Sequence, residues 1–236
     1  MIMKMSMLKK IAVCASAGAV FASFSAATAS AANDDYAKIN PSSYAAYTDS
    51  LTKADKIAIA AKEADSAKLA AQKKTSGKAD ADGSLPDFHV YTATAGDPVA
   101  AAIYSALMYI VKSAPSQATI ANTVKNDFAK IPAYMNARQS QCRYVLTGAQ
   151  TLTGFRNKIS YDINNAKVPT FLRLSNLSRA NWYYAASSTC ALVIGISADK
   201  TIVRIADPLS GRLAGCPSYF RKSAAFVNGH TTNICW

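Results

Sequence analysis

The sequence predicts an α+β domain in which a buried central helix packs on an antiparallel sheet. Three observations lead to this class. An almost wholly apolar helix is expected over residues 96–113, further helical segments follow it as far as residue 165, and the long strand-like runs come only after that point. Helices first and strands afterwards, with a tight turn at Asp199 and Lys200 between two strands, favour an antiparallel sheet over alternating β and α units.

The chain of 236 residues begins with the pattern of a secretory signal peptide. Lysines precede an apolar run from Ile11 to Phe24, and small residues follow as far as Ala31. The run is short and rich in alanine and serine, which argues against a membrane anchor. We therefore expect residues 1–31 to be removed on export, leaving a secreted or wall-associated chain without a transmembrane segment.

A helical extension is expected over residues 32–75. Within it, residues 51–74 contain no Gly or Pro and repeat apolar side chains every three or four positions. Because that apolar face is mostly alanine, the helix either packs lightly on the domain or stands off as a stalk, and it serves either as a spacer or as a propeptide. Residues 76–86, SGKADADGSLP, are expected to be a linker, and residues 87–236 the domain itself.

The central helix opens the domain's series of elements. Asp97 suits its N-cap and Pro98 its first turn, and the amino end of such a helix favours an anion. Around it the sequence predicts a short strand over 88–92, helices over 116–124, 131–138 and 151–165, and strands over 143–146, 168–174, 190–197, 201–207 and 231–236.

Positive charge is concentrated in the later part of the chain. The formal net charge is +12, and from Ile131 onward twelve lysines and arginines face three aspartates. A basic exported domain would be drawn to an anionic wall polymer, an anionic lipid or an acidic protein. Nucleic acid is not expected, because binding it needs no export. The same charge is also typical of a soluble basic surface that binds nothing.

Four cysteines remain after cleavage, and an exported protein is expected to pair them. They are Cys142, Cys190, Cys216 and Cys235, which allow three connectivities. Cys216 and Cys235 flank a short helical stretch and could lie on neighbouring strands, so we expect that bond and, by elimination, a second one between Cys142 and Cys190. Both expectations depend on the geometry of the strands.

The order of several phrases resembles a known family. GDPVAAAIYSALMYI, SQATIAN, VPTFLRL, ALVIGIS and IVRIADP, within residues 86–236, resemble secreted bacterial papain-like cysteine peptidases of the bacteriocin-processing, double-glycine-peptidase-like group. The resemblance implies a papain-like fold whose central helix begins Cys-Gly-Pro. A histidine begins the first long strand of that fold, and an Asp or Asn before proline ends the next. The helix end lowers the thiol pKa, the imidazole takes the proton and the carboxylate orients the imidazole.

Matched to this pattern, the chain lacks both the nucleophile and the base. Pro98 matches the family proline, which places Gly96 at the cysteine position and Asp97 at the glycine position. Thr189 stands at the histidine position. Only Asp207, in an Asp-Pro pair, matches the family's carboxylate, and such a pair is also a common turn starter.

Three other residues could replace the missing groups. Cys190 adjoins Thr189 on a strand and so points to the opposite face, which favours a structural cysteine. His89 on a short strand and His230 in a turn before the last strand are more typical of packed or surface histidines. Two histidines and few acidic residues offer no metal-ligand spacing, and no phosphate loop is present, so neither a metal nor another cofactor is expected.

The sequence therefore predicts a catalytically inactive pseudopeptidase. It would bind a peptide, a cell-wall component or a partner protein in the former substrate cleft. The alternatives are an active cysteine-peptidase-like hydrolase or transferase with a displaced nucleophile, and a basic structural protein of the cell wall. Likeness of fold does not decide among them, because function belongs to the site.

Overall fold

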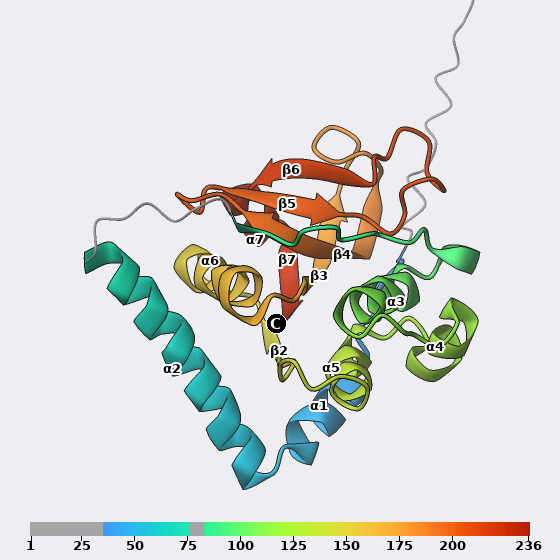
Figure 1. Ribbon diagram of the computed structural model, residues 1–236. Coiled ribbons are helices and arrows are strands. Elements are labelled where there is room, and N and C mark those ends of the chain that lie inside the picture. Colours follow the sequence, from blue (N-terminus) through green and yellow to red (C-terminus); the bar gives the residue numbers. More distant parts are fainter. Residues whose placement is uncertain (1–34, 76–82) are drawn as a thin grey trace, which may run out of the picture. The chain divides into compact units, whose positions relative to one another are not determined.

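An antiparallel sheet forms the centre of the computed structural model (Figure 1). The structure describes residues 35–75 and 83–236, which lie within one unit running from Ala31 to Trp236. The expected signal peptide, residues 1–31, lies outside the described residues. Within them, six strands follow the order β2-β7-β3-β4-β5-β6, and β1 pairs with β4. The strands are β1 (Gly83–Ser84), β2 (Leu146–Gly148), β3 (Thr170–Leu177), β4 (Ala186–Ile196), β5 (Ile202–Ala206), β6 (Tyr219–Ser223) and β7 (Thr231–Cys235).

Most of the helices precede the long strands, and helices pack against the sheet, so the fold is α+β as predicted. They are α1 (Pro41–Ser50), α2 (Lys53–Thr75), α3 (Pro98–Ile110), α4 (Gln117–Val124), α5 (Ile131–Asn136), α6 (Leu152–Tyr161) and α7 (Ala224–His230). Short helical turns lie at Thr94–Gly96, Phe128–Lys130 and Asp162–Ala166. Both α3 and α6 pack against β4 (Figure 1).

Helix α3 is the predicted central helix, and its apolar circumference explains its place. Val99, Ile103 and Leu107 are fully buried. Burying each of these side chains stabilises the fold by about 2 kcal/mol. The strand β4 is buried along almost its whole length for the same reason, since it lies between β3 and β5 and beneath α3. These two elements form the scaffold of the candidate site.

Two expectations about the elements are wrong, and one strand was missed. Residues 88–92 form no strand, because the Val90 N–H donates to the Tyr219 hydroxyl at 2.9 Å and the Tyr91 N–H to the Ser105 hydroxyl at 3.0 Å. Their backbone donors are thus used by side chains and not by a ladder. The strand expected over 143–146 begins only at Leu146. The strand β6 was not predicted at all.

The end of the expected linker belongs to the sheet. Gly83 and Ser84 form β1 and pair with Ile196 and Gly195 of β4. A Cβ at Gly195 would lie 2.9 Å from the Gly83 carbonyl oxygen, so glycine allows the two backbones to approach. Leu85 follows and is buried, with its N–H donating to the Ile194 carbonyl at 2.8 Å. The rest of the expected linker, residues 76–82, lies outside the described residues.

The predicted extension does not stand off as a stalk. We call residues 35–75 the N-terminal arm. Its long helix α2 packs against α6, and three of its side chains form ion pairs with the domain: Asp55 with Arg143, Lys62 with Asp162, and Glu63 with Lys158. The arm is therefore part of the folded unit, with charge contacts adding to its thin alanine face.

The ion pairs of α2 surround a buried tryptophan. The ammonium of Lys62 lies 4.4 Å from the Trp236 ring centre and that of Lys158 lies 4.0 Å from it. Lys62 also donates to the Arg143 carbonyl at 3.0 Å and stands 3.6 Å from Asp162 Oδ1. Burial raises the pKa of the Asp162 carboxyl to about 6, although Lys62 and a hydrogen bond from Thr170 act in the opposite direction. A buried cation between an aromatic ring and a carboxylate thus anchors α2.

Candidate functional site

The amino end of α3 is capped as the sequence predicts. Asp97 Oδ1 accepts a hydrogen bond from the Ala100 N–H at 2.9 Å, and Pro98 occupies the first turn. Burial raises the pKa of the Asp97 carboxyl, while the helix N–H groups lower it. Before the cap, Ala95 and Gly96 both have positive φ, at 51° and 74°. Residue 96 thus sits in a backbone conformation that favours glycine.

The loop that follows β5 packs against this helix end. The Ala93 N–H donates to the Pro208 carbonyl at 2.7 Å. A Cβ placed on Gly96 would lie 3.8 Å from the guanidinium of Arg212. The position that the resemblance assigns to a thiolate therefore has a glycine facing an arginine. Arg212 was not predicted as a site residue, and nothing in its sequence context marks it.

Thr189 and Asp207, the positions assigned to the base and its orienting carboxylate, are joined by Tyr184. The Tyr184 hydroxyl donates to Asp207 Oδ2 at 2.8 Å and lies 3.3 Å from the Thr189 hydroxyl. Asp207 Oδ1 accepts from the Leu209 N–H at 2.9 Å. We call Tyr184, Thr189 and Asp207 the Tyr184 cluster. Thr189 and Asp207 are fully buried and Tyr184 is 4 % exposed, so this cluster is closed to solvent.

Burial controls the protonation of this cluster. It raises the pKa of the Asp207 carboxyl to about 6, since the hydrogen bonds from Leu209 and Tyr184 offset only part of the desolvation. It also raises the pKa of the Tyr184 phenol well above its usual range, and the Asp207 charge adds to this shift. At neutral pH the phenol therefore stays protonated and acts as the donor. A neutral phenol bound to a carboxylate does not activate a nucleophile.

Cys190 is the thiol nearest in sequence to this cluster. It is fully buried and pairs in register with Arg173 of β3. Burial raises the pKa of its thiol well above the usual range, and the charges of Asp97 and Asp207 raise it further. Both carboxylates thus act on this part of β4, which means that the end of β5 and the amino end of α3 converge there. The thiol itself is protonated and enclosed, which disfavours a role as a nucleophile.

Neither histidine lies in this cluster. His89 is exposed, and its ring packs edge-on against Tyr91 at 4.5 Å between ring centres. His230 ends α7, where its Nδ1 lies 2.9 Å from the Ser175 carbonyl oxygen and its ring lies 4.5 Å from the Phe226 ring centre. The two rings thus contact aromatic and backbone groups. Neither is placed beside a thiol.

The described cysteines are free thiols, so the structure holds neither of the two expected disulfides. The expected Cys216–Cys235 bond assumed neighbouring strands. Cys216 lies in the loop after β5, whereas Cys235 is on β7, and the sheet order places β3 and β4 between these two strands. Strands are about 4.8 Å apart, so three spacings exceed the roughly 7 Å that a disulfide can span between Cα atoms.

An extended piece of the N-terminal arm lies directly beside the Tyr184 cluster. We call Asp35–Asn40 the strap segment. The Tyr36 N–H donates to the Ser188 carbonyl at 2.8 Å, and the Tyr36 ring packs edge-on against the Tyr184 ring at 6.3 Å between centres. Ala37, the next residue, is fully buried. The strap segment therefore covers the strand edge next to Thr189, and sequence reasoning missed it because its short polar context predicts no element.

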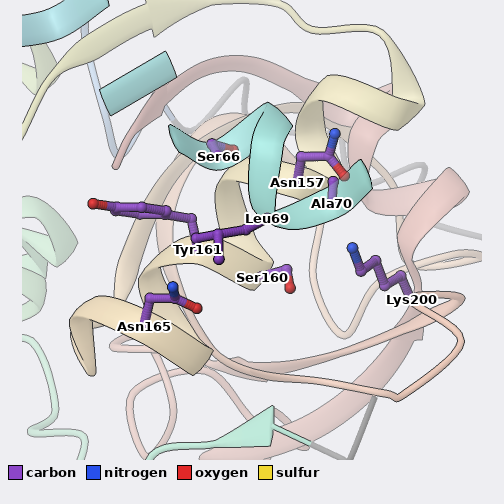
Figure 2. Close-up of a pocket in the computed structure, with 8 residues that line it drawn as sticks. All are labelled: Ser66, Leu69, Ala70, Asn157, Ser160, Tyr161, Asn165 and Lys200. Atoms are coloured by element: carbon purple, nitrogen blue, oxygen red, sulfur yellow. The ribbon is translucent and has the colours of Figure 1, made fainter. Parts of the chain in front are cut away.

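A separate shallow pocket lies between α2 and α6, with about 210 Å³ of empty space, part of it open to solvent. Figure 2 shows side chains of both helices around it, and it is lined by Ser66, Leu69, Ala70, Asn157, Ser160, Tyr161, Asn165 and Lys200. These residues do not include any of the predicted site positions. Over the part of the chain that the structure describes, no group of three or more His, Cys, Asp or Glu is placed to hold a metal ion, and no helix is long and apolar enough to cross a membrane.

Comparisons with protein-family models, with curated proteins and with solved structures find no significant match. The site is therefore described by its own geometry. Two predicted positions, Thr189 and Asp207, are joined by Tyr184, and the other two, Gly96 and Asp97, lie at the amino end of α3, a helix that packs on β4. The backup histidines lie elsewhere.

Proposed function

We propose that this protein is a secreted, papain-like-fold binding protein that does not hydrolyse peptides. Its ligand is a peptide, held where the start of β4 meets the loop after β5 and the amino end of α3. Export is supported by the lysine and apolar pattern of residues 1–31. The papain-like assignment is supported by the order of the elements and by the Tyr184 hydroxyl, which joins two of the four positions that the resemblance assigns to the site.

The Tyr184 cluster is the observation that carries the proposal. A cysteine peptidase needs a thiolate, an imidazole within hydrogen-bond reach and a group that orients the imidazole. Here Asp207 is already engaged by the Tyr184 hydroxyl and by Leu209, and its neighbour Thr189 has no basic group. The residues that would perform chemistry are replaced by a closed hydrogen-bond network without a thiolate or an imidazole.

The choice of a peptide over a wall polymer follows from the strap segment. A stretch of backbone in extended conformation is already bound beside the cluster through the Ser188 carbonyl. Main-chain pairing of this kind is a general way to bind extended peptides. A polysaccharide offers no N–H groups of matching spacing.

The proposal is tested on residues 32–236 of the chain with two assays. The first measures cleavage of quenched fluorescent peptides and denatured casein between pH 5 and pH 8. The second measures retention of a peptide library on the immobilised protein, with soluble protein as competitor. We expect no cleavage and competed retention of a subset of peptides.

Cys190→Ser and His230→Ala serve as matched variants in the cleavage assay. Because Cys190 is buried and protonated and His230 lies on α7, both should behave as the unmodified protein does. Cleavage by the unmodified protein that disappears in either variant would show an enzyme with a displaced nucleophile. Absence of any retained peptide would refute the binding part of the proposal.

A further inference from the structure

The strap segment is bound as a peptide ligand would be bound, and this inference rests on the proposed function. We propose that Asp35–Asn40 is an internal occupant of the ligand site, and that the natural ligand is an extended peptide that displaces it. The ligand shares the pattern of the strap segment: an acidic residue, an aromatic one, a small one, any residue, and an aliphatic one.

Backbone contacts hold the strap segment at both of its ends. The Tyr36 N–H donates to the Ser188 carbonyl at 2.8 Å. Two residues later, the Lys38 N–H donates to the Asn126 carbonyl at 2.9 Å and the Lys38 carbonyl accepts from the Phe128 N–H at 2.8 Å. These contacts are short parallel bridges to β4 and to the turn before α5. These hydrogen bonds join backbone atoms only, so an extended peptide of any sequence could form them.

Two polar side chains of the domain form hydrogen bonds with the middle of the strap segment. The Arg173 Nε donates to the Ala37 carbonyl at 2.7 Å. The Ser188 hydroxyl lies within hydrogen-bond distance of the same carbonyl and of the Asp35 carboxylate. Burial lowers the pKa of the Arg173 guanidinium and the Asp35 charge raises it, so an acidic residue at this end of the peptide complements the site.

Specificity comes from the side chains that face the domain. Ala37 is fully buried, which leaves no room for a larger residue at that position. Tyr36 packs on the ring of Tyr184, and Ile39 packs against the hydrophobic core. Lys38 is exposed, so its position accepts any side chain. Tyr36, Ala37 and Ile39 thus face the domain, whereas Asp35, Lys38 and Asn40 are exposed.

The strap segment and α2 are held by separate contacts, so the strap segment can detach from the domain while α2 stays bound to it. The helix α1, which joins them, has no buried residue. Its Tyr47 hydroxyl accepts from the Leu146 N–H at 3.1 Å, Tyr44 and Tyr47 pack against the core, and the helix contacts the turn at Phe128–Lys130. The ion pairs of Lys62 and Glu63 anchor α2 independently. Each hydrogen bond of the strap segment contributes about 1 kcal/mol, which is within the range that a competing peptide can supply.

The test compares binding of one labelled peptide to closed and opened forms of residues 32–236. The peptide carries residues 35–40, DYAKIN, with a fluorescent label, and its affinity is measured by anisotropy. Ala37→Arg should eject the strap segment because the arginine cannot be buried there, and Tyr36→Ala is a second opening variant in case the first is unstable. Lys38→Ala is the matched control, since its side chain is exposed and its backbone contacts persist.

We expect the opened variants to bind the peptide about tenfold more tightly than the unmodified protein and the Lys38→Ala control, because a tethered segment competes at a high effective concentration. A peptide with arginine in place of alanine should not bind. Equal affinity of opened and closed forms, or equal binding of the arginine peptide, would overturn this inference. If the inference fails in this way but library peptides of unrelated pattern still bind the closed protein, the proposed peptide-binding function remains supported. If no peptide binds any form of the protein, both the inference and the proposed function are refuted.

Discussion

Replacing Asp207 by asparagine should make the protein more stable at neutral pH and flatten its dependence on pH. Asp207 is fully buried and accepts hydrogen bonds from the Leu209 N–H and the Tyr184 hydroxyl. An asparagine has the same shape and can still accept from Leu209. Its amide can donate to the Tyr184 oxygen, whose own proton can turn to Thr189, so the network survives without the buried charge.

The magnitude follows from the pKa of Asp207. The folded value of about 6 lies about two units above the ordinary value of 3.8. One unit corresponds to about 1.4 kcal/mol, so keeping the ionised carboxylate buried costs about 3 kcal/mol. Because the folded pKa is raised, the stability linked to this proton is fully present below about pH 4 and is lost as pH rises through 6. The free energy of unfolding should therefore fall over that window.

Urea unfolding at half-unit steps from pH 4 to pH 8 measures this effect. The difference between the unmodified protein and Asp207→Asn should grow by about 3 kcal/mol in favour of the variant between pH 4 and pH 7. Asp199→Asn is the control: this exposed carboxyl has its pKa lowered to about 2 by hydrogen bonds from Ser197 and Thr201, so its ionisation changes below the window. Its curve should run parallel to that of the unmodified protein.

A constant difference between Asp207→Asn and the unmodified protein over the whole range would refute the argument. It would mean that Asp207 is ionised or protonated to the same degree in the folded and unfolded chains. The Tyr184 cluster would then not be the closed, desolvated network described here, and the proposed replacement of catalytic groups by that network would lose its physical basis.

Three further outcomes are expected. Lys62→Ala should lower the free energy of unfolding by about 3 kcal/mol, because it leaves the buried carboxylate of Asp162 without its cation. Lys56→Ala, at an exposed position of the same helix, is the control and should have little effect in the same urea-unfolding assay. Gly96→Ala should cost about 1 kcal/mol because residue 96 has a φ of 74°, whereas Gly148→Ala, with open space around its Cβ and no positive φ, should be near neutral in thermal melts. Iodoacetamide at neutral pH should leave Cys190 unmodified in the folded protein, as mass mapping would show, and rapid labelling there would restore interest in a reactive thiol.

Local signals in the sequence predict most of the helices and the central strands. The helix at α4 follows from the N-cap Ser116, and α6 from its amphipathic spacing after Thr151. The central strands β3 and β4 follow from runs rich in β-branched and other apolar residues, VPTFLRL and CALVIGIS. By contrast, residues 88–92 have the composition of a strand and no strand partner, and only the fold shows that side chains take their N–H groups.

Some residues of the candidate site could be predicted from the sequence, and others could not. The resemblance selected Gly96, Asp97, Thr189 and Asp207, and of these Thr189 and Asp207 share Tyr184 as a hydrogen-bond partner. It could not indicate Tyr184 or Arg212, because both reach the site from loops whose paths depend on packing elsewhere. The expected Cys216–Cys235 bond fails for a related reason: strand order in a sheet is set by pairing across the whole fold and not by nearness in sequence.

What the sequence alone determined is the class of the fold, the capped central helix, and the presence of Gly96 and Thr189 at the two positions that the resemblance matched, because each of these depends on residue type and local spacing. The tertiary structure alone decided that the arm docks through Lys62 against Trp236 and Asp162, and that the strap segment occupies the edge of β4. These contacts join residues about a hundred or more positions apart. Their energies come from burial and pairing, and neither exists until the chain has folded.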